Sequence, residues 1–136
     1  MCGRFTDLRV SVVHGGVGYG KQREEAARGV DIVAATPGRL LDLLEQGSLN
    51  FRHVKILVLD EVDRMLDMGF LPDVRRIVEQ ISTDRQTLLF SATITPTVRK
   101  LAEKILYKPE TVTIGKPLSA AKSVEQRAVA SRGANK

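Results

Sequence analysis

Short apolar runs alternate with longer amphipathic segments along most of this chain. Runs rich in Val, Ile and Leu predict strands, and these lie at residues 9–14, 31–35, 55–60, 86–90 and 110–114. Segments of helix-forming residues, or of apolar residues at helical spacing, predict helices, and these begin at residues 21, 37, 72 and 96. Because strands and helices alternate, the sequence predicts an α/β protein with a parallel sheet.

The ends of these helices are marked by capping and stop residues. Thr36 and Thr95 each precede a proline, so each is placed to cap a helix that begins at that proline. Gly29 and Gly47 are placed to end the first two helices. The helix that begins at residue 72 has its apolar residues at the spacing i, i+3, i+4 and i+7, namely Val74, Ile77, Val78 and Ile81.

The strand predicted at residues 55–60 has an apolar run that stops at acidic residues. A continuous apolar run of this kind is typical of a parallel strand that is buried on both faces, and such strands present ligands at their C-terminal ends. Asp60 and Glu61 stand at that end. In nucleotide hydrolases an Asp there holds Mg²⁺ through water, and a neighbouring Glu positions or deprotonates the attacking water. A solvated acidic turn is the alternative, and the two residues alone favour neither.

A glycine-rich loop follows the first predicted strand. Residues 15–22 fit the pattern G-x-x-x-x-G-K of a phosphate-binding loop, with Gln22 where that pattern ends in Ser or Thr. One hypothesis is therefore a self-contained nucleotide site, in which backbone N–H groups and Lys21 bind phosphates and Asp60 binds the metal ion. Gln22 counts against this hypothesis, because it lacks the hydroxyl group that would bind Mg²⁺.

The segment from Thr36 to Arg39 predicts an anion site at the start of a helix. Exposed N–H groups and the positive end of the helix dipole favour an anion there. Arg39 is a cation in the first turn and opposes that dipole, so its position makes sense if an external phosphate or a nearby carboxylate supplies the counter-charge. A plain helix cap beside an exposed arginine is the alternative.

Composition and charge restrict the function. The chain has 136 residues, of which 43% are apolar and 27% charged, as is typical of one globular domain. Its net charge is +5, but residues 115–136 hold five basic residues and one acidic residue and so account for +4. The rest is close to neutral, so the charge gives no reason to expect a basic nucleic-acid-binding surface. An aromatic content of 4% without Trp argues against a platform for base stacking.

Several other kinds of protein are excluded. Cys2 is the only cysteine, so neither an intrachain disulfide nor a cysteine-based metal cluster is possible. His14 and His53 are more typical of strand ends or loops than of metal ligands. No apolar run is long enough to span a membrane, and the first residues do not resemble a signal peptide. We therefore expect a cytoplasmic protein without a membrane partner.

Three segments together resemble the DEAD-box RNA helicases. These segments occur in the family's order and at its spacing, and they are Ala35-Thr36-Pro37-Gly38-Arg39, Asp60-Glu61-Val62-Asp63 and Ser91-Ala92-Thr93. The resemblance extends from Leu8 to about Ser123. Val62 stands where the family usually has Ala, and we expect this difference to change only local packing.

The resemblance implies the α/β fold of a RecA-like domain, in which helices flank a parallel sheet. It also implies that this is the first such domain and is truncated at its N-terminus, because the family's phosphate-loop strand and helix have no counterpart here; a second helicase domain is absent as well. Residues 1–114 would form the partial ATP-binding domain. Residues 115–136 are expected to form a basic linker or disordered tail.

The resemblance further implies ATP and Mg²⁺ as cofactors and RNA as the partner. The positions that match the family's catalytic residues are Asp60, Glu61, Asp63, Ser91 and Thr93, with Asp60 holding Mg²⁺ through water. In the family the Ser-Ala-Thr segment hydrogen-bonds the last Asp of the acidic motif, here Asp63, and couples the nucleotide state to strand separation. The positions that match RNA-binding residues are Gly15, Gly16, Thr36, Pro37, Gly38 and Arg39, which would contact the RNA backbone and not read its sequence.

Residues after the acidic motif are expected to support it. Arg64 and Asp67 match positions that stabilise the turn after the motif. The apolar residues of the same segment are expected in the core, and they are Met65, Leu66, Met68 and Phe70.

The sequence therefore predicts a fragment of an ATP-dependent RNA helicase, which couples ATP hydrolysis to RNA duplex unwinding and is inactive as this chain alone. Two alternatives stay open: a non-enzymatic remnant that binds RNA, and a self-contained nucleotide-binding domain that uses residues 15–21. The missing phosphate-loop strand would lie between residues 86–90 and 110–114. We therefore also expect the chain to self-associate, because a central strand would be left with an unpaired edge.

Overall fold

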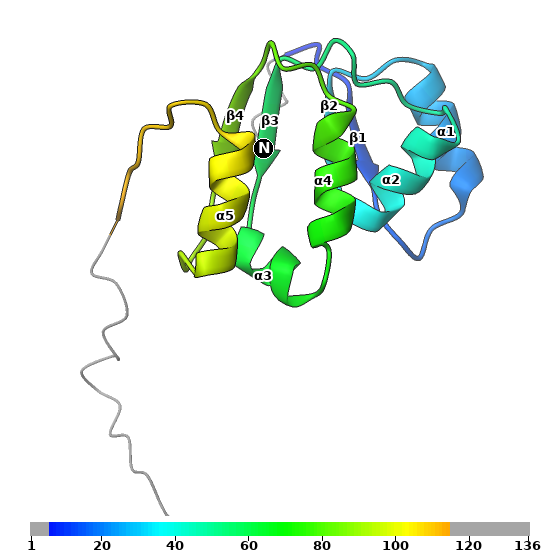
Figure 1. Cartoon of the computed structure of the whole chain (residues 1–136). Coiled ribbons are helices and arrows are strands. Elements are labelled where there is room, and N and C mark those ends of the chain that lie inside the picture. Colours follow the sequence, from blue (N-terminus) through cyan, green and yellow to red (C-terminus); the bar gives the residue numbers. More distant parts are fainter. Residues whose placement is uncertain (1–5, 115–136) are drawn as a thin grey trace, which may run out of the picture.

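The computed structural model describes residues 6–114, so the predicted tail at residues 115–136 lies outside the described part. Strands and helices alternate through this part in the order β1 (Val10–Val13), α1 (Tyr19–Ala27), β2 (Ile32–Ala35), α2 (Pro37–Glu45), β3 (Ile56–Leu59), α3 (Val62–Asp67), α4 (Leu71–Glu79), β4 (Gln86–Leu89) and α5 (Pro96–Ile105), as Figure 1 shows. All four predicted helices form, and each begins within two residues of the position expected. None of the helices described is long and apolar enough to cross a membrane.

The strands form two parallel pairs. β1 pairs with β2, which sets Val13 beside Ala35. β3 pairs with β4, which sets Leu59 beside Leu89, so the two strands that carry the acidic and Ser-Ala-Thr segments are neighbours. Parallel pairing with helical connections confirms the predicted α/β class, but within the described residues no hydrogen-bonded ladder joins the two pairs into one sheet.

The predicted strand at residues 110–114 does not form. Val112 and Ile114 are 84% and 95% exposed, and no strand of the described chain lies beside this segment as a hydrogen-bonded partner. A segment with strong β propensity becomes a strand only where a neighbour satisfies its backbone groups. This prediction was therefore wrong because no partner strand is present among the described residues, although the local β propensity is strong.

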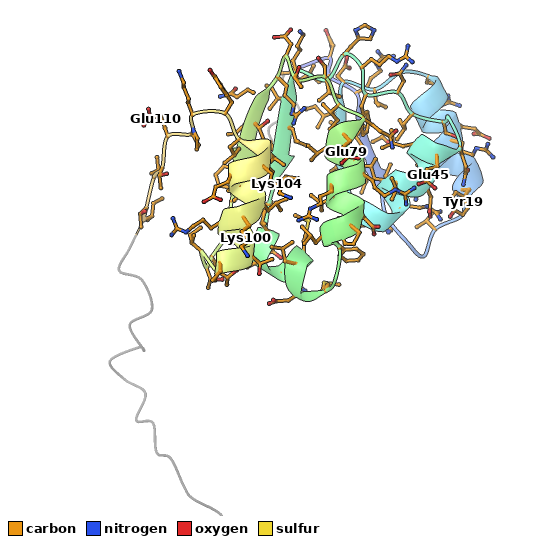
Figure 2. All side chains as sticks on the ribbon, viewed as in Figure 1. Tyr19, Glu45, Glu79, Lys100, Lys104 and Glu110 are labelled. Atoms are coloured by element: carbon orange, nitrogen blue, oxygen red, sulfur yellow. The ribbon has the colours of Figure 1, made fainter. Side chains whose placement is uncertain are left out.

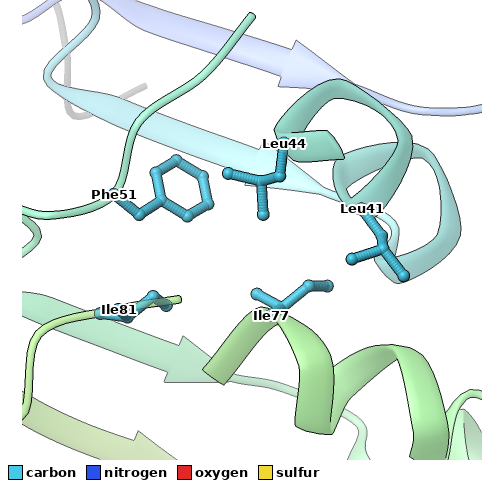
Figure 3. Close-up of a cluster of buried hydrophobic side chains, with 5 residues drawn as sticks. All are labelled: Leu41, Leu44, Phe51, Ile77 and Ile81. Atoms are coloured by element: carbon cyan, nitrogen blue, oxygen red, sulfur yellow. The ribbon is translucent and has the colours of Figure 1, made fainter. Parts of the chain in front are cut away.

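One hydrophobic cluster joins the two strand pairs through their helices. Its buried members come from α2, α4 and the segments that follow them, and they are Leu41, Leu44, Phe51, Ile77 and Ile81, shown in Figure 3. Val33 of β2 and Leu57 of β3 pack against the same cluster. The contact between α2 and α4 thus places β1–β2 beside β3–β4 although the two pairs share no ladder.

A second cluster lies under α3, α4 and α5. Its buried members are Leu59, Val62, Val74, Val98 and Leu101. Val62 is fully buried, so the residue after Glu61 anchors the acidic segment in the core. Val stands here in place of the family's usual Ala, and its side chain is accommodated within this cluster.

The strand face opposite the helices is exposed. Ile56 and Val58 of β3 are 61% and 53% exposed, and Val10 and Val12 of β1 are exposed as well. Alternate residues of a strand point to opposite faces, and among the described residues α2, α4 and α5 cover one face only (Figure 1). The expectation that residues 55–60 are buried on both faces was therefore wrong for this chain.

Helix α3 was not predicted from the sequence. It has six residues, which is too short for a helical period to show in the pattern of apolar positions. Met65, Leu66 and Phe70 pack against the second cluster as expected. Met68 is 63% exposed, so its predicted place in the core was wrong; it stands at the C-terminal cap of α3, beyond the part of the helix that packs.

Candidate functional site

The acidic segment and the Ser-Ala-Thr segment are held together at the C-terminal ends of β3 and β4. Phe90 N–H donates to the Leu59 carbonyl at 2.8 Å, which continues the ladder past the last paired residues. Val62 N–H then donates to the Phe90 carbonyl at 3.1 Å. These two bonds and the buried Val62 side chain hold the acidic segment and the Ser-Ala-Thr segment in place.

Asp63 is the centre of the hydrogen bonds between the two segments. Its Oδ2 accepts from the backbone N–H and the hydroxyl group of Thr93, both at 2.8 Å. Its own N–H donates to Ser91 Oγ at 3.3 Å, and Ser91 Oγ donates to the Thr93 carbonyl at 2.8 Å. Arg64 N–H donates to the other oxygen, Oδ1, at 3.0 Å. The pairing of Asp63 with this segment, which the resemblance implied, is present in the structure.

These bonds favour the charged form of Asp63. The Thr93 hydroxyl group contributes most to holding the pKa of this carboxyl group below its ordinary value of 3.8, and the N–H groups of Thr93 and Arg64 act in the same direction. Partial burial opposes them, because it disfavours a charge. Asp63 is therefore an ionised acceptor that ties the two segments together.

Asp60 and Glu61 project from the turn between β3 and α3. Both are exposed, and Asp60 Oδ1 accepts from Glu61 N–H at 2.9 Å, which leaves Oδ2 without a partner among the described residues. Glu61 has φ 48° and ψ 46°, the left-handed conformation that a residue with a side chain rarely adopts. Its carboxylate accepts from Arg64 Nη1 at 3.0 Å, and both side chains are largely exposed. Both carboxylates are therefore exposed at this turn.

An open pocket of about 740 Å³ lies at this turn. Its charged lining consists of one guanidinium group, that of Arg64, and four carboxylates, those of Asp60, Glu61, Asp63 and Asp67. In the described residues no group of three or more His, Cys, Asp or Glu is arranged to hold a metal ion. The free oxygen of Asp60 fits Mg²⁺ nevertheless, because Mg²⁺ keeps most of its water and usually takes only one or two carboxylates together with substrate phosphates.

The second predicted region lies where β1 and β2 end. Gly15 and Gly16 are exposed, and Gly16 has φ +84°, a conformation that favours glycine. Thr36 N–H donates to the Val13 carbonyl at 3.0 Å, which holds the start of α2 beside this loop. An added Cβ at Gly15 or Gly16 would meet no atom within 4 Å, so the loop is open to an approaching group.

The N-terminus of α2 has free donors. Thr36 is the N-cap, as predicted, but its side chain makes no capping bond, whereas Thr95 Oγ1 accepts from Val98 N–H at 3.2 Å. Pro37 has no N–H, and the N–H groups of Gly38 and Arg39 precede the first intrahelical donor, Leu40. Two backbone N–H groups therefore remain available to an anion.

Arg39 is held by neutral groups. Its Nε donates to Gln22 Oε1 at 3.0 Å, its Nη2 donates to the Val17 carbonyl, and the guanidinium group lies 3.4 Å from the centroid of the Tyr19 ring. Tyr19, labelled in Figure 2 at the start of α1, donates from its hydroxyl group to Asp42 Oδ2 at 2.9 Å. No carboxylate of the described chain forms an ion pair with Arg39, so its positive charge is not neutralised there.

Gln22 and Tyr19 were not identified as functional residues from the sequence. Gln22 is only 3% exposed, and its Nε2 donates to the His14 carbonyl at 3.1 Å. It therefore faces the interior and does not occupy the position of a metal ligand, which gives the hypothesis of a self-contained nucleotide loop no support. The sequence offered one signal for the role of Gln22. It is a polar residue on the inner face of a helix that has few apolar residues.

The two regions are neighbours. A Cβ added at Gly38 would lie 3.8 Å from both the Phe70 ring and the Asp73 carboxylate, so the start of α2 faces the segment that follows α3. Phe70 in turn packs against the cluster that contains Val62. The structure therefore brings all eleven predicted site residues to the end of the fold where the strands finish (Figure 1).

Comparison with protein families identifies the kind of domain. A family model described as DEAD/DEAH box helicase matches residues 1–101. The ATP-dependent RNA helicase DBP2 of Vanderwaltozyma polyspora is 51% identical over 129 residues, which cover 92% of this chain and 29% of that protein. The DEAD-box ATP-dependent RNA helicase 30 of Oryza sativa subsp. japonica is 51% identical over 125 residues, which cover 91% of this chain and 19% of that protein.

Solved structures agree with these sequences. The yeast DEAD-box splicing factor Prp28 matches with a TM-score of 0.78 and 38% identity over 84% of this chain and 26% of that one. A DEAD box protein from Methanococcus jannaschii matches with a TM-score of 0.73 and 38% identity over 76% of this chain and 28% of that one. The chain thus spans between about a fifth and a third of the length of these relatives.

Proposed function

This chain belongs to the DEAD/DEAH box helicase family, and on that premise we propose that it carries part of an ATP-hydrolysis site and an RNA-backbone site of an ATP-dependent RNA helicase. The observation that supports the proposal most directly is the set of hydrogen bonds from Ser91 and Thr93 to Asp63 beside the outward-facing Asp60 and Glu61. The activity that is proposed is ATP hydrolysis coupled to unwinding of duplex RNA.

Each residue of the acidic segment has a separate role in this proposal. The free oxygen of Asp60 would hold Mg²⁺ through water, and a bound Mg²⁺ supplies positive charge to the phosphates that react. Glu61 would orient the attacking water and accept its proton, which requires the exposed bond to Arg64 to open. Asp63 would transmit the state of the site to the Ser-Ala-Thr segment, because its carboxylate and its N–H form hydrogen bonds with Ser91 and Thr93.

The RNA site is proposed at the other region. A phosphate group would accept from the N–H groups of Gly38 and Arg39 at the start of α2, where the helix dipole also favours it. The unneutralised charge of Arg39 would add to the attraction, and Gly15 and Gly16 would let a second phosphate approach the backbone closely. Contacts of this kind recognise the RNA backbone and not its bases.

We propose that this chain alone has no RNA-stimulated ATPase activity. Four carboxylates and a single guanidinium group line the pocket at Asp60. An environment with that charge repels a triphosphate unless further donors and cations face it. In this proposal the pocket supplies the carboxylates that would bind the metal ion, and Arg64 is the only cation among the described residues that line it.

Steady-state hydrolysis assays with and without RNA test this statement. We expect the same rate for the chain and for Glu61→Gln, equal to background. Turnover that disappears in Glu61→Gln would contradict it. Nucleotide binding that depends on Lys21 would instead favour the alternative of a self-contained loop at residues 15–21.

RNA binding is the part of the proposal that this chain can show by itself. We expect weak affinity for unrelated single strands, insensitive to sequence and steeply dependent on salt. Arg39→Ala should lower the affinity about tenfold and reduce the magnitude of the salt slope by about 0.7. Arg75→Ala removes the same charge from an exposed position of α4 and should have a smaller effect. Strong preference for one sequence, or equal effects of both substitutions, would contradict the RNA site.

Salt-sensitive RNA binding that is lost in Arg39→Ala, together with no ATP hydrolysis under any condition, would favour the non-enzymatic alternative. A longer relative should then also lose its activity when this chain's residues replace its own. We propose ATP, Mg²⁺ and RNA as the ligands of this chain and the cytoplasm as its location.

A further inference from the structure

We propose that Gln22 is a positioning residue for RNA binding: it orients the guanidinium group of Arg39 and the glycine loop together while leaving the charge of Arg39 available to a phosphate. The inference rests on the proposed RNA site. It adds a residue that the sequence motifs do not include and a reason why that residue is an amide.

Both polar atoms of the Gln22 amide group form hydrogen bonds. The amide nitrogen donates to the His14 carbonyl at 3.1 Å, and the amide oxygen accepts from Arg39 Nε at 3.0 Å. With 3% of the residue exposed, water does not compete effectively for either bond. Only a side chain with a donor and an acceptor at its end satisfies both partners at this site.

The two partners belong to the two segments of the RNA site. His14 is the residue directly before Gly15 and Gly16, and Arg39 ends the segment that begins α2. One buried side chain therefore sets the position of the loop and of the guanidinium group relative to each other. The Val17 carbonyl and the Tyr19 ring hold the same guanidinium group from the loop and from α1.

The neutrality of Gln22 is central to the inference. An arginine that is ordered by a carboxylate has its charge compensated before a ligand arrives, whereas one ordered by an amide, a carbonyl and a ring keeps it. The guanidinium group has five N–H donors, and two of its nitrogen atoms are used here, so donors remain for a phosphate. The structure thus combines a fixed orientation with an uncompensated charge.

Affinity for a mixed-sequence single-stranded RNA, measured with the whole chain, tests the proposal through two substitutions at one residue. Gln22→Met keeps the length and neutrality but loses both bonds, and it should weaken binding about threefold to tenfold. Gln22→Glu keeps an acceptor for Arg39 but compensates its charge, so it should weaken binding and also reduce the magnitude of the salt slope by about 0.7. Gln80→Met, the same change at an exposed glutamine after α4, should leave the affinity unchanged.

A double-mutant cycle separates positioning from a general structural effect. If Gln22 acts through Arg39, Gln22→Met has no further effect in the Arg39→Ala background. Additive effects of the two substitutions would overturn the inference. An effect of Arg39→Ala without any effect of Gln22→Met would also overturn it while leaving the proposed RNA site intact, whereas no effect of Arg39→Ala would remove both.

A measurement without RNA covers the case in which Gln22→Met does not fold. The Arg39 Nε–H group should give a resolved NMR signal that exchanges slowly with water, because it is bonded to a buried acceptor. Gln22→Glu should retain this signal. A signal averaged with those of exposed arginines such as Arg75 would overturn the inference without reference to any ligand.

Discussion

At the scale of a single residue, Asp63 contributes both to the stability of the fold and to the proposed site. Its folded pKa lies below the ordinary 3.8 because the Thr93 hydroxyl group and nearby N–H groups favour the carboxylate. As the pH falls below 3.8, the unfolded chain therefore takes up a proton before the folded chain does. The stabilisation is present in full above that pH and is lost as the pH falls through the folded pKa.

Substitution of Thr93 by Val should show this linkage. The variant loses the hydroxyl donor but keeps the backbone N–H, so the pKa of Asp63 should rise towards 3.8 and the urea midpoint at pH 7 should fall. The difference from the wild type should shrink when both are measured at pH values below the folded pKa. Thr97→Val, the same change at an exposed residue of α5, is the control. A constant difference across the pH series would show that Thr93 acts by packing alone.

Glu61 adopts a left-handed backbone conformation that its side chain disfavours. We expect Glu61→Gly to be more stable than Glu61→Ala by about 1 kcal/mol, because both remove the exposed bond to Arg64 but only glycine relieves the backbone. Urea unfolding measures the difference. At Glu103, inside α5, the order should reverse, since glycine costs about 1 kcal/mol relative to alanine in a helix. The same order at both positions would contradict the strained turn.

At the scale of elements, packing between helices joins the two strand pairs, which share no hydrogen-bonded ladder among the described residues. α2 follows β2, and α4 connects β3 to β4, so their contact joins the two strand pairs. The ion pair between Arg76 and Glu45 crosses the same contact, but both side chains are about half exposed, and such pairs contribute little. The apolar cluster of Figure 3 therefore carries most of this connection.

Truncation of Ile77 should show how much that cluster contributes. Ile77→Ala should lower the free energy of unfolding by about 2–5 kcal/mol, a large part of the total for a domain of this size. Ile114→Ala makes the same change at a residue that is almost fully exposed, and it should change the free energy by less than about 0.5 kcal/mol. Equal midpoints for Ile77→Ala and the wild type in urea would mean that the strand pairs are joined by some other contact.

At the scale of the whole molecule, the described strands and helices leave several large apolar side chains exposed. Within the described part of the chain, the strand face with Val10, Val12, Ile56 and Val58 has no layer over it, and β4 pairs on one side only. Parallel sheets normally have both faces covered, and an unpaired edge is a template for another chain. Because of these features we expect the chain to associate with itself.

Light scattering and thermal unfolding at several concentrations test that expectation. We expect the apparent mass to increase with concentration and the transition to depend on concentration, because association is coupled to folding. Val58→Lys places a charge on the uncovered face and should reduce the association. A monomer with one sharp transition at every concentration would show that the described strands and helices form a self-sufficient domain.

What the sequence determined by itself is local. The contact between Asp63 and Thr93 joins residues 30 positions apart and was implied by the resemblance to a family, not by spacing. The positions of β3, β4, α2, α4 and α5, in contrast, follow from apolar spacing, and the start of α5 follows from Thr95 and Pro96. Each of these depends on neighbours within a few residues, and such neighbours are visible in a sequence.

Only the tertiary structure decided which segments meet. Among the described residues, no strand pairs with residues 110–114 and no layer covers Ile56 and Val58, although their composition is that of a strand and of a core. Gln22 is hydrogen-bonded to two segments that are distant in the sequence. The physical reason is the same in each case. Hydrogen-bond partners and burial are supplied by residues distant in the chain, and the properties of a residue and its near neighbours do not specify them.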